Sequence, residues 1–285
     1  MIKLVASDLD GTIIDKNNSI YKNNFDAIKA MADKHIDFVI CTGKTYPIIK
    51  GVCSKFDATY GIFGNGNQII NLKTGEEIYK EFLSSNGINT CIDIAKRENL
   101  HVHLYTDTSI ITEKLLYMDL RNFKLKDNVF YNSSLDITII KDLKDYVSKN
   151  HVDVYKLVIS STDDLDYIKD EIIENTDLSA VTVSKRGQYK DTIIDKEYDY
   201  LDITPKNISK SRALEILGNY LNVSTSEIMA VGDGVNDLDM IKNVGYGVAV
   251  ANAYDELKEA ATYTTENPVE TGGFAEAVYK YIEFQ

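Results

Sequence analysis

The chain has 285 residues, 44% of them hydrophobic and 26% charged, which is ordinary for a globular protein and long enough for one large or two modest domains. Its formal net charge of −13 argues against nucleic acid or an anionic membrane as a partner. An anionic substrate would need a local reversal of sign. No apolar run approaches the roughly 18 residues of a membrane span.

The cysteine pattern predicts a cytoplasmic protein. The chain has three cysteines, an odd number without Cys-x-x-Cys spacing, at Cys41, Cys53 and Cys91. We expect reduced thiols, because disulfides persist mainly in oxidising compartments. The first residues enter an apolar strand directly and do not form a basic and then apolar signal segment, which favours the same location.

The chain opens with an apolar run at residues 2–6, which is typical of a strand buried on both faces. Two acids follow it, Asp8 and Asp10, and then the turn-former Gly11. In a parallel α/β sheet, ligands bind in the crevice beyond the carboxyl ends of the strands. We therefore expect both acids to lie where the chemistry takes place.

A helix is predicted over residues 23–35, because apolar side chains recur on one helical face, namely Phe25, Ile28, Met31 and Ala32. A second strand over residues 36–41 ends at Thr42 and Gly43. A strand–helix–strand unit of this length is almost always right-handed, which makes the two strands parallel neighbours. Thr42 should then lie at the same edge of the sheet as Asp8.

A helix with Pro47 in its first turn, a third strand at residues 60–63 and a hairpin over residues 68–80 complete the first segment. The third strand is closed by Gly64, Asn65 and Gly66. This stretch lacks the third glycine and the lysine of known phosphate-binding loops, so we interpret it as an ordinary loop.

The middle of the chain predicts a separate domain. Helical stretches at residues 87–99 and 163–175 alternate with strand-like stretches at 102–105, 154–160 and 180–184, while residues 115–140 give no assignment. We expect residues 1–81 and 200–285 to form one discontinuous core, with residues 82–199 as an inserted α/β domain.

The last segment again predicts alternating helices and strands. A helix over residues 208–221 has Lys210 in its first turn, and a capping box at Ser224 and Glu227 precedes a buried strand at 228–231. That strand ends in the run Gly232-Asp-Gly-Val-Asn-Asp237. A strand at 246–250 follows, then a helix that Asn252 could cap, and a final helix at 274–282.

Together these segments supply the parts of a phosphoryl-transfer site. Acidic oxygen ligands such as Asp8 and Asp233 suit Mg²⁺. A carboxylate can act as the phosphoryl acceptor, which suggests Asp8 as nucleophile, and Asp10 could protonate the leaving oxygen and then activate water. Thr42, with the amide of Gly43, and Lys210 would offer donors and positive charge to the phosphoryl oxygens.

The sequence resembles a known family at these residues. The stretch from Asp8 to Thr12, the pair Thr42–Gly43, Lys210 and the run from Gly232 to Asp237 match, in order, the four motifs of the haloacid dehalogenase (HAD) superfamily. The insert resembles, by position and length, the C2-type cap of its Cof-like phosphatase branch (subfamily IIB). The stretch from Gly247 to Asn252 is also similar to that branch. The fold implied is a Rossmann-like core with a parallel sheet and an inserted α/β cap.

The resemblance also implies roles for single residues. Asp8 would be the nucleophile and Asp10 the acid and base; the metal would be held by Asp8, the Asp10 carbonyl and Asp233, with Asp237 in support; Thr42, Lys210 and Asn236 would hold phosphate. Lys44 stands where the family commonly has arginine, and we assign it no role. Lys206 is an alternative phosphate contact. We favour Lys210, because Lys210 matches the motif and lies at the start of a helix.

We therefore expect a Mg²⁺-dependent phosphatase that hydrolyses small phosphomonoesters, such as sugar phosphates, through an aspartyl-phosphate. Its partner would be a small phosphorylated metabolite, and the inserted domain would select the substrate. An alternative is a phosphohexomutase, which uses the same nucleophile but returns the phosphoryl group to a sugar hydroxyl. The sequence leaves this alternative and the oligomeric state open.

Overall fold

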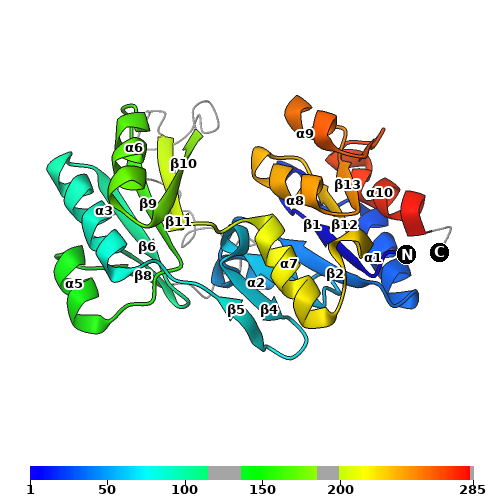
Figure 1. Cartoon of the computed structure of the whole chain (residues 1–285), viewed down its shortest axis with the longest axis horizontal. Coiled ribbons are helices and arrows are strands. Elements are labelled where there is room, and N and C mark those ends of the chain that lie inside the picture. The colour runs from blue at the N-terminus through cyan, green and yellow to red at the C-terminus, as the bar shows by residue number, and fades with distance from the viewer. Residues whose placement is uncertain (115–135, 185–198, 283–285) are drawn as a thin grey trace. The chain divides into compact units, whose positions relative to one another are not determined.

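The computed structural model describes residues 1–114, 136–184 and 199–282, which are drawn as coloured ribbon in Figure 1. The chain divides into two compact units. The first comprises Met1–Lys44, Gly51–Lys80 and Ile208–Gln285, and the second comprises Thr45–Lys50 and Glu81–Asn207. Within the described ranges, no helix is long and apolar enough to cross a membrane.

The first unit is built on an eight-stranded sheet of order β14-β13-β12-β1-β2-β3-β4-β5. The strands from β14 to β3 are parallel, and β4 and β5 add an antiparallel hairpin. The strand bounds are Leu4–Ser7 for β1, Asp37–Cys41 for β2, Tyr60–Phe63 for β3, Gln68–Asn71 for β4, Glu77–Lys80 for β5, Ile228–Gly232 for β12, Tyr246–Ala249 for β13 and Tyr263–Thr264 for β14. The predicted α/β class with a parallel core sheet is confirmed.

The register of the central strand decides what meets at the edge of this sheet. Ser7, the last residue of β1, lies opposite Val231 of β12 on one side and Ile40 of β2 on the other. All four residues of β1 are buried. The loops that follow β1, β2 and β12 therefore begin side by side, and β2 is the parallel neighbour of β1 that the sequence predicted.

Helices cover both faces of the first sheet. The chain passes from β1 through α1 to β2, but from β12 through α8 to β13 in the opposite direction along the sheet. Because such crossovers are right-handed, α1 and α8 lie on opposite faces. Helix α10 packs with α1, and α7 and α9 pack with α8. The bounds are Lys22–Asp33 for α1, Lys210–Leu221 for α7, Leu238–Asn243 for α8, Asp255–Ala260 for α9 and Gly273–Ile282 for α10.

The buried face of α1 differs from the predicted one. It contains Asn24 and Ala27 with Ile28 and Met31, whereas Phe25 is 38% exposed and Ala32 is exposed. Asn24 can be buried because both ends of its amide are paired: Nδ2 donates to the Ile13 carbonyl at 3.4 Å, and Oδ1 accepts from the Ala275 amide at 3.2 Å. The prediction considered only apolar side chains and so placed the buried face of α1 at a different angle around the helix.

Of the two predicted caps, one is correct and one is wrong. The capping box of Ser224 and Glu227 is present. Asn252 does not cap α9, since its Nδ2 donates to the Gly11 carbonyl and its Oδ1 accepts from the Val269 amide, both at 2.8 Å. Its side chain thus ties the loop after β1 to the segment before α10.

The second unit has a six-stranded sheet of order β10-β11-β9-β6-β7-β8. Its helices lie against one face, and they share a core of buried apolar side chains with the strands (Figure 1). The helix bounds are Ser85–Arg97 for α3, Leu143–Asn150 for α5 and Asp166–Asn175 for α6; the strand bounds are His101–Tyr105 for β6, Ser109–Thr112 for β7, Asp136–Ile139 for β8, Lys156–Ser161 for β9, Leu178–Ser184 for β10 and Asp199–Pro205 for β11. The sequence did not predict α5, β7, β8 or β11.

The boundary between the units lies beyond the predicted residue 200. Strand β11 pairs with β9 and β10, so residues 199–205 belong to the sheet of the second unit, and the first unit resumes at Ile208. The residues of β11 alternate between buried and half-buried, a pattern that a strand in either sheet could show. Residues 115–135 of the stretch left without assignment lie outside the described residues.

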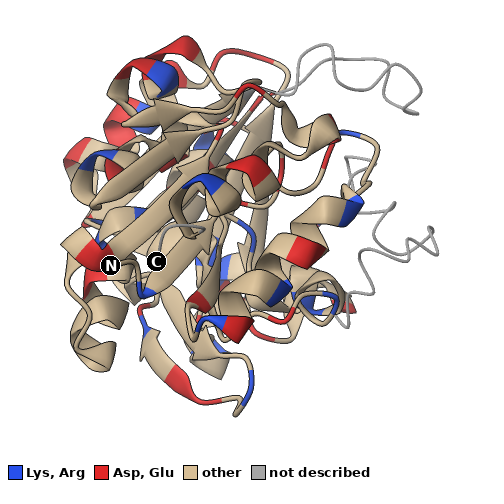
Figure 2. Ribbon diagram, turned by 90° about the vertical axis from the view of Figure 1, so that its right-hand side faces the viewer, with Lys and Arg blue, Asp and Glu red and all other residues tan. Residues whose placement is uncertain are grey.

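The charged residues and the cysteines are distributed as follows in the structure. Acidic residues are spread over many helices and loops, with lysines and arginines interspersed among them (Figure 2). The cysteines at positions 41, 53 and 91 are free and buried.

Candidate active site

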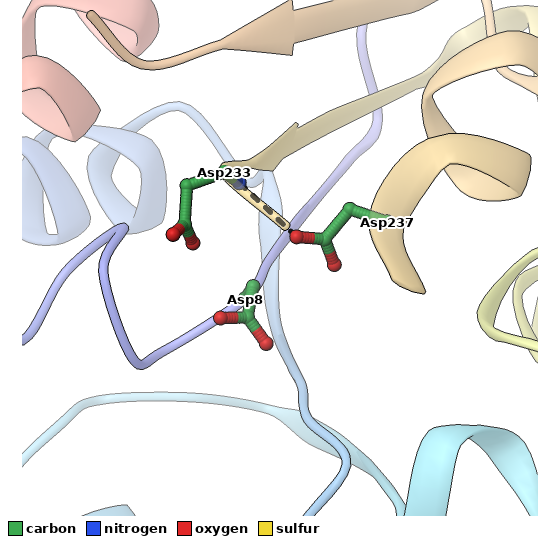
Figure 3. A group of neighbouring side chains, drawn as sticks. All are labelled: Asp8, Asp233 and Asp237. Carbon is green, nitrogen blue, oxygen red and sulfur yellow. Dashed lines mark hydrogen bonds between the residues drawn. The ribbon is translucent and has the colours of Figure 1, made fainter. Parts of the chain in front are cut away.

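Three carboxylates gather at the carboxyl end of the central strands. Asp8 directly follows β1, and its amide donates to the Val231 carbonyl of β12 at 3.0 Å. Asp233 directly follows β12, and Asp237 ends the short turn before α8. One ligand oxygen from each acid lies within 4.8 Å of the others, and Figure 3 shows the three carboxyl groups around one common space.

Lys210 joins two of these acids. It is the first residue of α7, its side chain is fully buried, and its Nζ donates to Asp8 Oδ1 and to Asp237 Oδ1, each at 2.6 Å. A buried ammonium between two carboxylates is satisfied in charge and in hydrogen bonding. Lys206, the alternative that the sequence left open, is exposed.

Asp237 shapes the loop that carries Asp233. Its Oδ2 accepts from the backbone amides of Asp233 at 3.1 Å and Gly234 at 2.9 Å, while its Oδ1 accepts from Lys210. The carboxylate is therefore fully enclosed by donors, which explains how it can be completely buried. Figure 3 shows the first of these bonds as a dashed line between Asp233 and Asp237.

The loop after β1 packs tightly on Asp233, and here the sequence analysis missed a residue. Thr12 Oγ1 donates to Asp233 Oδ1 at 2.8 Å. Gly11 has a φ of +86°, and a Cβ at this position would lie 2.2 Å from Asp233 Oδ2. Only glycine fits, because of both the backbone conformation and the missing space. The Gly-Thr pair after the second acid was the available sign that this loop supports Asp233.

Asp10 lies apart from the group of three. Its carboxylate contacts Lys44 Nζ, at 2.6 Å from Oδ1 and 2.5 Å from Oδ2, and both side chains are substantially exposed. The predicted metal role of Asp10 concerned its backbone carbonyl, so the position of the side chain does not bear on it. Lys44, which received no role from the sequence, is thus a direct partner of the predicted general acid.

The predicted phosphate-binding residues lie on both sides of Asp8. Thr42 follows β2, is almost fully buried, and accepts from the Lys44 amide at 3.2 Å through Oγ1, so that its hydroxyl proton remains available for donation. Asn236 comes from the loop after β12, is exposed, and donates from Nδ2 to Asn65 Oδ1 at 3.3 Å. Asn65 was not among the predicted site residues.

Burial sets the electrostatics of this group. It raises the pKa of Asp8 to about 8; Lys210 opposes this rise, and Asp237, Asp10 and Asp233 add to it. Burial likewise raises the pKa of Asp233 to about 6, against the hydrogen bond from Thr12. For Lys210, burial lowers the pKa, but Asp237 and Asp8 outweigh it and hold the pKa well above its usual range. Without a cation the group therefore retains protons near neutral pH.

Comparisons with known proteins show the family to which this chain belongs. The family model described as haloacid dehalogenase-like hydrolase matches residues 5–278. A 5-amino-6-(5-phospho-D-ribitylamino)uracil phosphatase from Bacillus subtilis is 28% identical over 288 residues, which is 95% of this chain and 95% of that protein. An HMP-PP phosphatase from Yersinia pestis is 25% identical over 260 residues, or 91% of this chain and 87% of that protein.

The fold also resembles a solved structure, that of a sugar phosphatase of HAD subclass IIB. The TM-score is 0.76 at 19% sequence identity, and the match covers 99% of this chain and 100% of the other. At this identity the likeness concerns the fold alone.

Proposed function

Because the chain belongs to the haloacid dehalogenase-like hydrolases and is a phosphatase of their Cof-like branch, we propose that it hydrolyses small phosphomonoesters through an aspartyl-phosphate formed on Asp8, with Mg²⁺ as cofactor. The observation that carries this proposal is the group of Asp8, Asp233 and Asp237, whose ligand oxygens lie within 4.8 Å of one another at the end of the central strand.

The donor set fits Mg²⁺, since it consists of hard carboxylate oxygens, the ligands that this ion takes beside water and substrate phosphate. Asp8, the backbone carbonyl of Asp10 and Asp233 would hold the ion, and Asp237 would support it by fixing the Asp233 loop. When bound, Mg²⁺ would offset the charge of the acids and of the approaching phosphate.

Asp8 is the proposed nucleophile. Lys210 holds its Oδ1 and stabilises the ionised form, which burial alone disfavours. In the first step a carboxylate oxygen of Asp8 bonds to phosphorus, the ester P–O bond breaks, and the leaving oxygen takes a proton from Asp10. In the second step Asp10 removes a proton from water, whose oxygen attacks phosphorus, and the aspartyl P–O bond breaks to release phosphate and free Asp8.

The proposed ligands of the transferring phosphoryl group are Thr42, Gly43, Lys210 and Asn236. An ammonium has three donors, and two of those on Lys210 are used by Asp8 and Asp237, which leaves one for a phosphoryl oxygen. Thr42 retains its hydroxyl proton. Fixed donors of this kind cost no reorganisation during the reaction, which is why they stabilise the transition state.

The proposed substrates are phosphorylated metabolites of sugar-like character. The name of one similar protein, a 5-amino-6-(5-phospho-D-ribitylamino)uracil phosphatase, supports this class. We assign substrate selection to the inserted unit, Glu81–Asn207 in the structure, as a C2-type cap. A cytoplasmic location is part of the proposal, and the free, buried cysteines support it.

The proposal is tested with p-nitrophenyl phosphate and a panel of sugar phosphates, with and without Mg²⁺. Wild type should release phosphate steadily only with the cation. Asp8→Asn should lower kcat by roughly 10⁴-fold or more, because it removes the attacking oxygen while keeping the shape of the side chain. Appreciable turnover by Asp8→Asn would exclude Asp8 as nucleophile. Activity that requires a bisphosphorylated sugar would support the phosphohexomutase instead.

A further inference from the structure

The turn after β3 has an unusual backbone next to the candidate active site. Three consecutive residues have positive φ: Gly64 at 59°, Asn65 at 58° and Gly66 at 119°. Among residues with a side chain, asparagine tolerates this conformation well, and Asn65 shares it with Asn18, Asn99, Asn207 and Asn222. From its sequence this stretch is expected to be an ordinary loop, and none of its residues takes part in the proposed mechanism.

The backbone of the turn is fastened to the loop after β2. The Asn65 amide donates to the Thr42 carbonyl at 3.0 Å, and the Gly64 amide donates to the Lys44 carbonyl at 2.9 Å. These two bonds lie on either side of Gly43. The turn therefore fixes the backbone that carries the Thr42 hydroxyl and the Gly43 amide.

The side chain of Asn65 lies against Gly43 itself. A Cβ on residue 43 would be 2.8 Å from Asn65 Oδ1 and 3.1 Å from its Nδ2. The carboxamide thus occupies the space that a side chain at position 43 would need. A side chain at position 43 would therefore have to displace the Asn65 carboxamide, and glycine at this position lets that carboxamide lie against the loop after β2.

The same carboxamide reaches the loop on the other side of Asp8. Asn236 Nδ2 donates to Asn65 Oδ1 at 3.3 Å. Strands β2 and β12 are the two neighbours of β1, so Asn65 joins the two loops that flank the proposed nucleophile. Asn236 is exposed, and its side chain is hydrogen-bonded to that of Asn65.

We propose that Asn65 is a positioning residue for phosphoryl transfer: it orients the Asn236 carboxamide and holds the Thr42–Gly43 loop at the distance that a phosphoryl group requires. The inference rests on the proposed function. An exposed asparagine without a fixed partner samples several rotamers, and a donor must be held in the productive geometry to stabilise a transition state. Asn65 acts through its neighbours and need not touch the substrate.

The test is Asn65→Gly, which removes the carboxamide and suits the positive φ. The matched control is Asn222→Gly, because Asn222 has nearly the same backbone conformation, with φ of 56°, at the end of α7 in the same unit. With p-nitrophenyl phosphate and Mg²⁺, Asn65→Gly should lower kcat/KM by about 10- to 100-fold and weaken inhibition by inorganic phosphate. Asn222→Gly should change neither.

Thermal unfolding of both variants separates positioning from folding. Glycine tolerates both backbone conformations, so we expect similar midpoints for the two variants. An Asn65→Gly protein with wild-type kcat/KM and wild-type phosphate inhibition would overturn the inference. An equal loss of activity in Asn222→Gly would also overturn it, because the loss would then come from the backbone substitution.

A double-mutant cycle with Asn236→Ala tests the route. If Asn65 acts by orienting Asn236, Asn65→Gly should cost much less in the Asn236→Ala background than in wild type. Fully additive losses would overturn this route. The wild type is the reference in each case: a wild-type protein without Mg²⁺-dependent phosphatase activity contradicts the proposed function, whereas an active wild type matched by Asn65→Gly contradicts the inference alone.

Discussion

Asp8 and Asp10 lie two residues apart on the loop after β1. Each of them pairs with a lysine, yet the two pairs differ in their surroundings. Asp8 and Lys210 meet at 2.6 Å with side-chain exposures of 9% and 0%, while Asp10 and Lys44 meet at 2.5 Å with exposures of 47% and 30%. A buried pair is costly to break, because one charge is then left without a partner or water, whereas water replaces the partner in an exposed pair. Similar distances therefore do not mean similar energies.

The contrast also separates the two proposed roles. The nucleophile must stay in one place and react as the carboxylate; the buried Lys210 fixes its Oδ1 and favours the ionised form, while the proposed Mg²⁺ would supply the remaining positive charge. A general acid has to approach the leaving oxygen and exchange protons with water, so a partner that can be replaced by solvent suits Asp10. The following experiments test this difference, beginning with the largest expected effect.

Lys210→Met should break the buried pair. Asp8 and Asp237 would both lose their cation, and we expect the free energy of unfolding without Mg²⁺ to fall by about 3–5 kcal/mol. Urea unfolding measures this loss, which should shrink when Mg²⁺ is added or when the pH is lowered, since either neutralises the carboxylates. A loss below about 1 kcal/mol would mean that the burial of Lys210 is energetically unimportant.

Asp10→Asn should affect turnover in a way that depends on the leaving group. For alkyl phosphates such as sugar phosphates, whose leaving oxygen needs a proton, kcat should fall by about 10²- to 10⁴-fold. For p-nitrophenyl phosphate the fall should be much smaller in the first step, because nitrophenolate leaves without protonation. Single-turnover kinetics on both substrates measure the difference, and equal losses would count against Asp10 as the acid.

The pH dependence of stability should report the buried group. The folded pKa of Asp8, about 8, lies above the unfolded value of about 3.9. The folded chain then binds the proton more tightly, so the stability of the metal-free protein should decrease as the pH rises from about 4 to about 8, with Asp233 contributing up to about pH 6. Lys210 stays charged in this window.

Thermal unfolding in EDTA between pH 5 and 8 checks this direction. Added Mg²⁺ competes with the protons, so its apparent affinity should strengthen with pH, by at most about tenfold per unit for each proton displaced. A metal-free protein that becomes more stable toward pH 8 would contradict the assignment.

Lys44→Met should have the smallest effect. The pair is exposed, so the free energy of unfolding should change by less than about 1 kcal/mol in a urea titration. A loss as large as that of Lys210→Met would remove the distinction between the two pairs.

The elements that carry the site could be predicted from the sequence because they combine a buried apolar run with an abrupt polar end. Asp8, Thr42 and Asp233 each directly follow such a strand, and parallel pairing then places them together. Thr12 and Asn65 could not be found this way. Their partners, Asp233 and Asn236, are far away in the sequence, and only the register between β1, β2, β3 and β12 brings them close.

Two further features of the fold, on α1 and at β11, could not be predicted from the sequence, each for a different reason. On α1 the buried face includes a polar residue, Asn24, because its carboxamide is hydrogen-bonded to the Ile13 carbonyl and to the amide of Ala275 in the first turn of α10. At residues 200–205 the sequence predicts the start of the returning core, whereas these residues form β11, and only its pairing with β9 and β10 shows that they belong to the second unit. Both are tertiary effects that local patterns do not contain.

The bridge made by Asn252 has a practical consequence for anyone who shortens this protein. By linking the Gly11 carbonyl to the Val269 amide, it connects the turn beside Asp10 with the segment that leads into the last helix. Trimming the chain before residue 269 would remove one end of that bridge and leave the Asn252 side chain with its bond to Gly11 alone. The segment around Val269 thus helps to support the loop that carries Asp8 and Asp10, and a shortened variant should keep it.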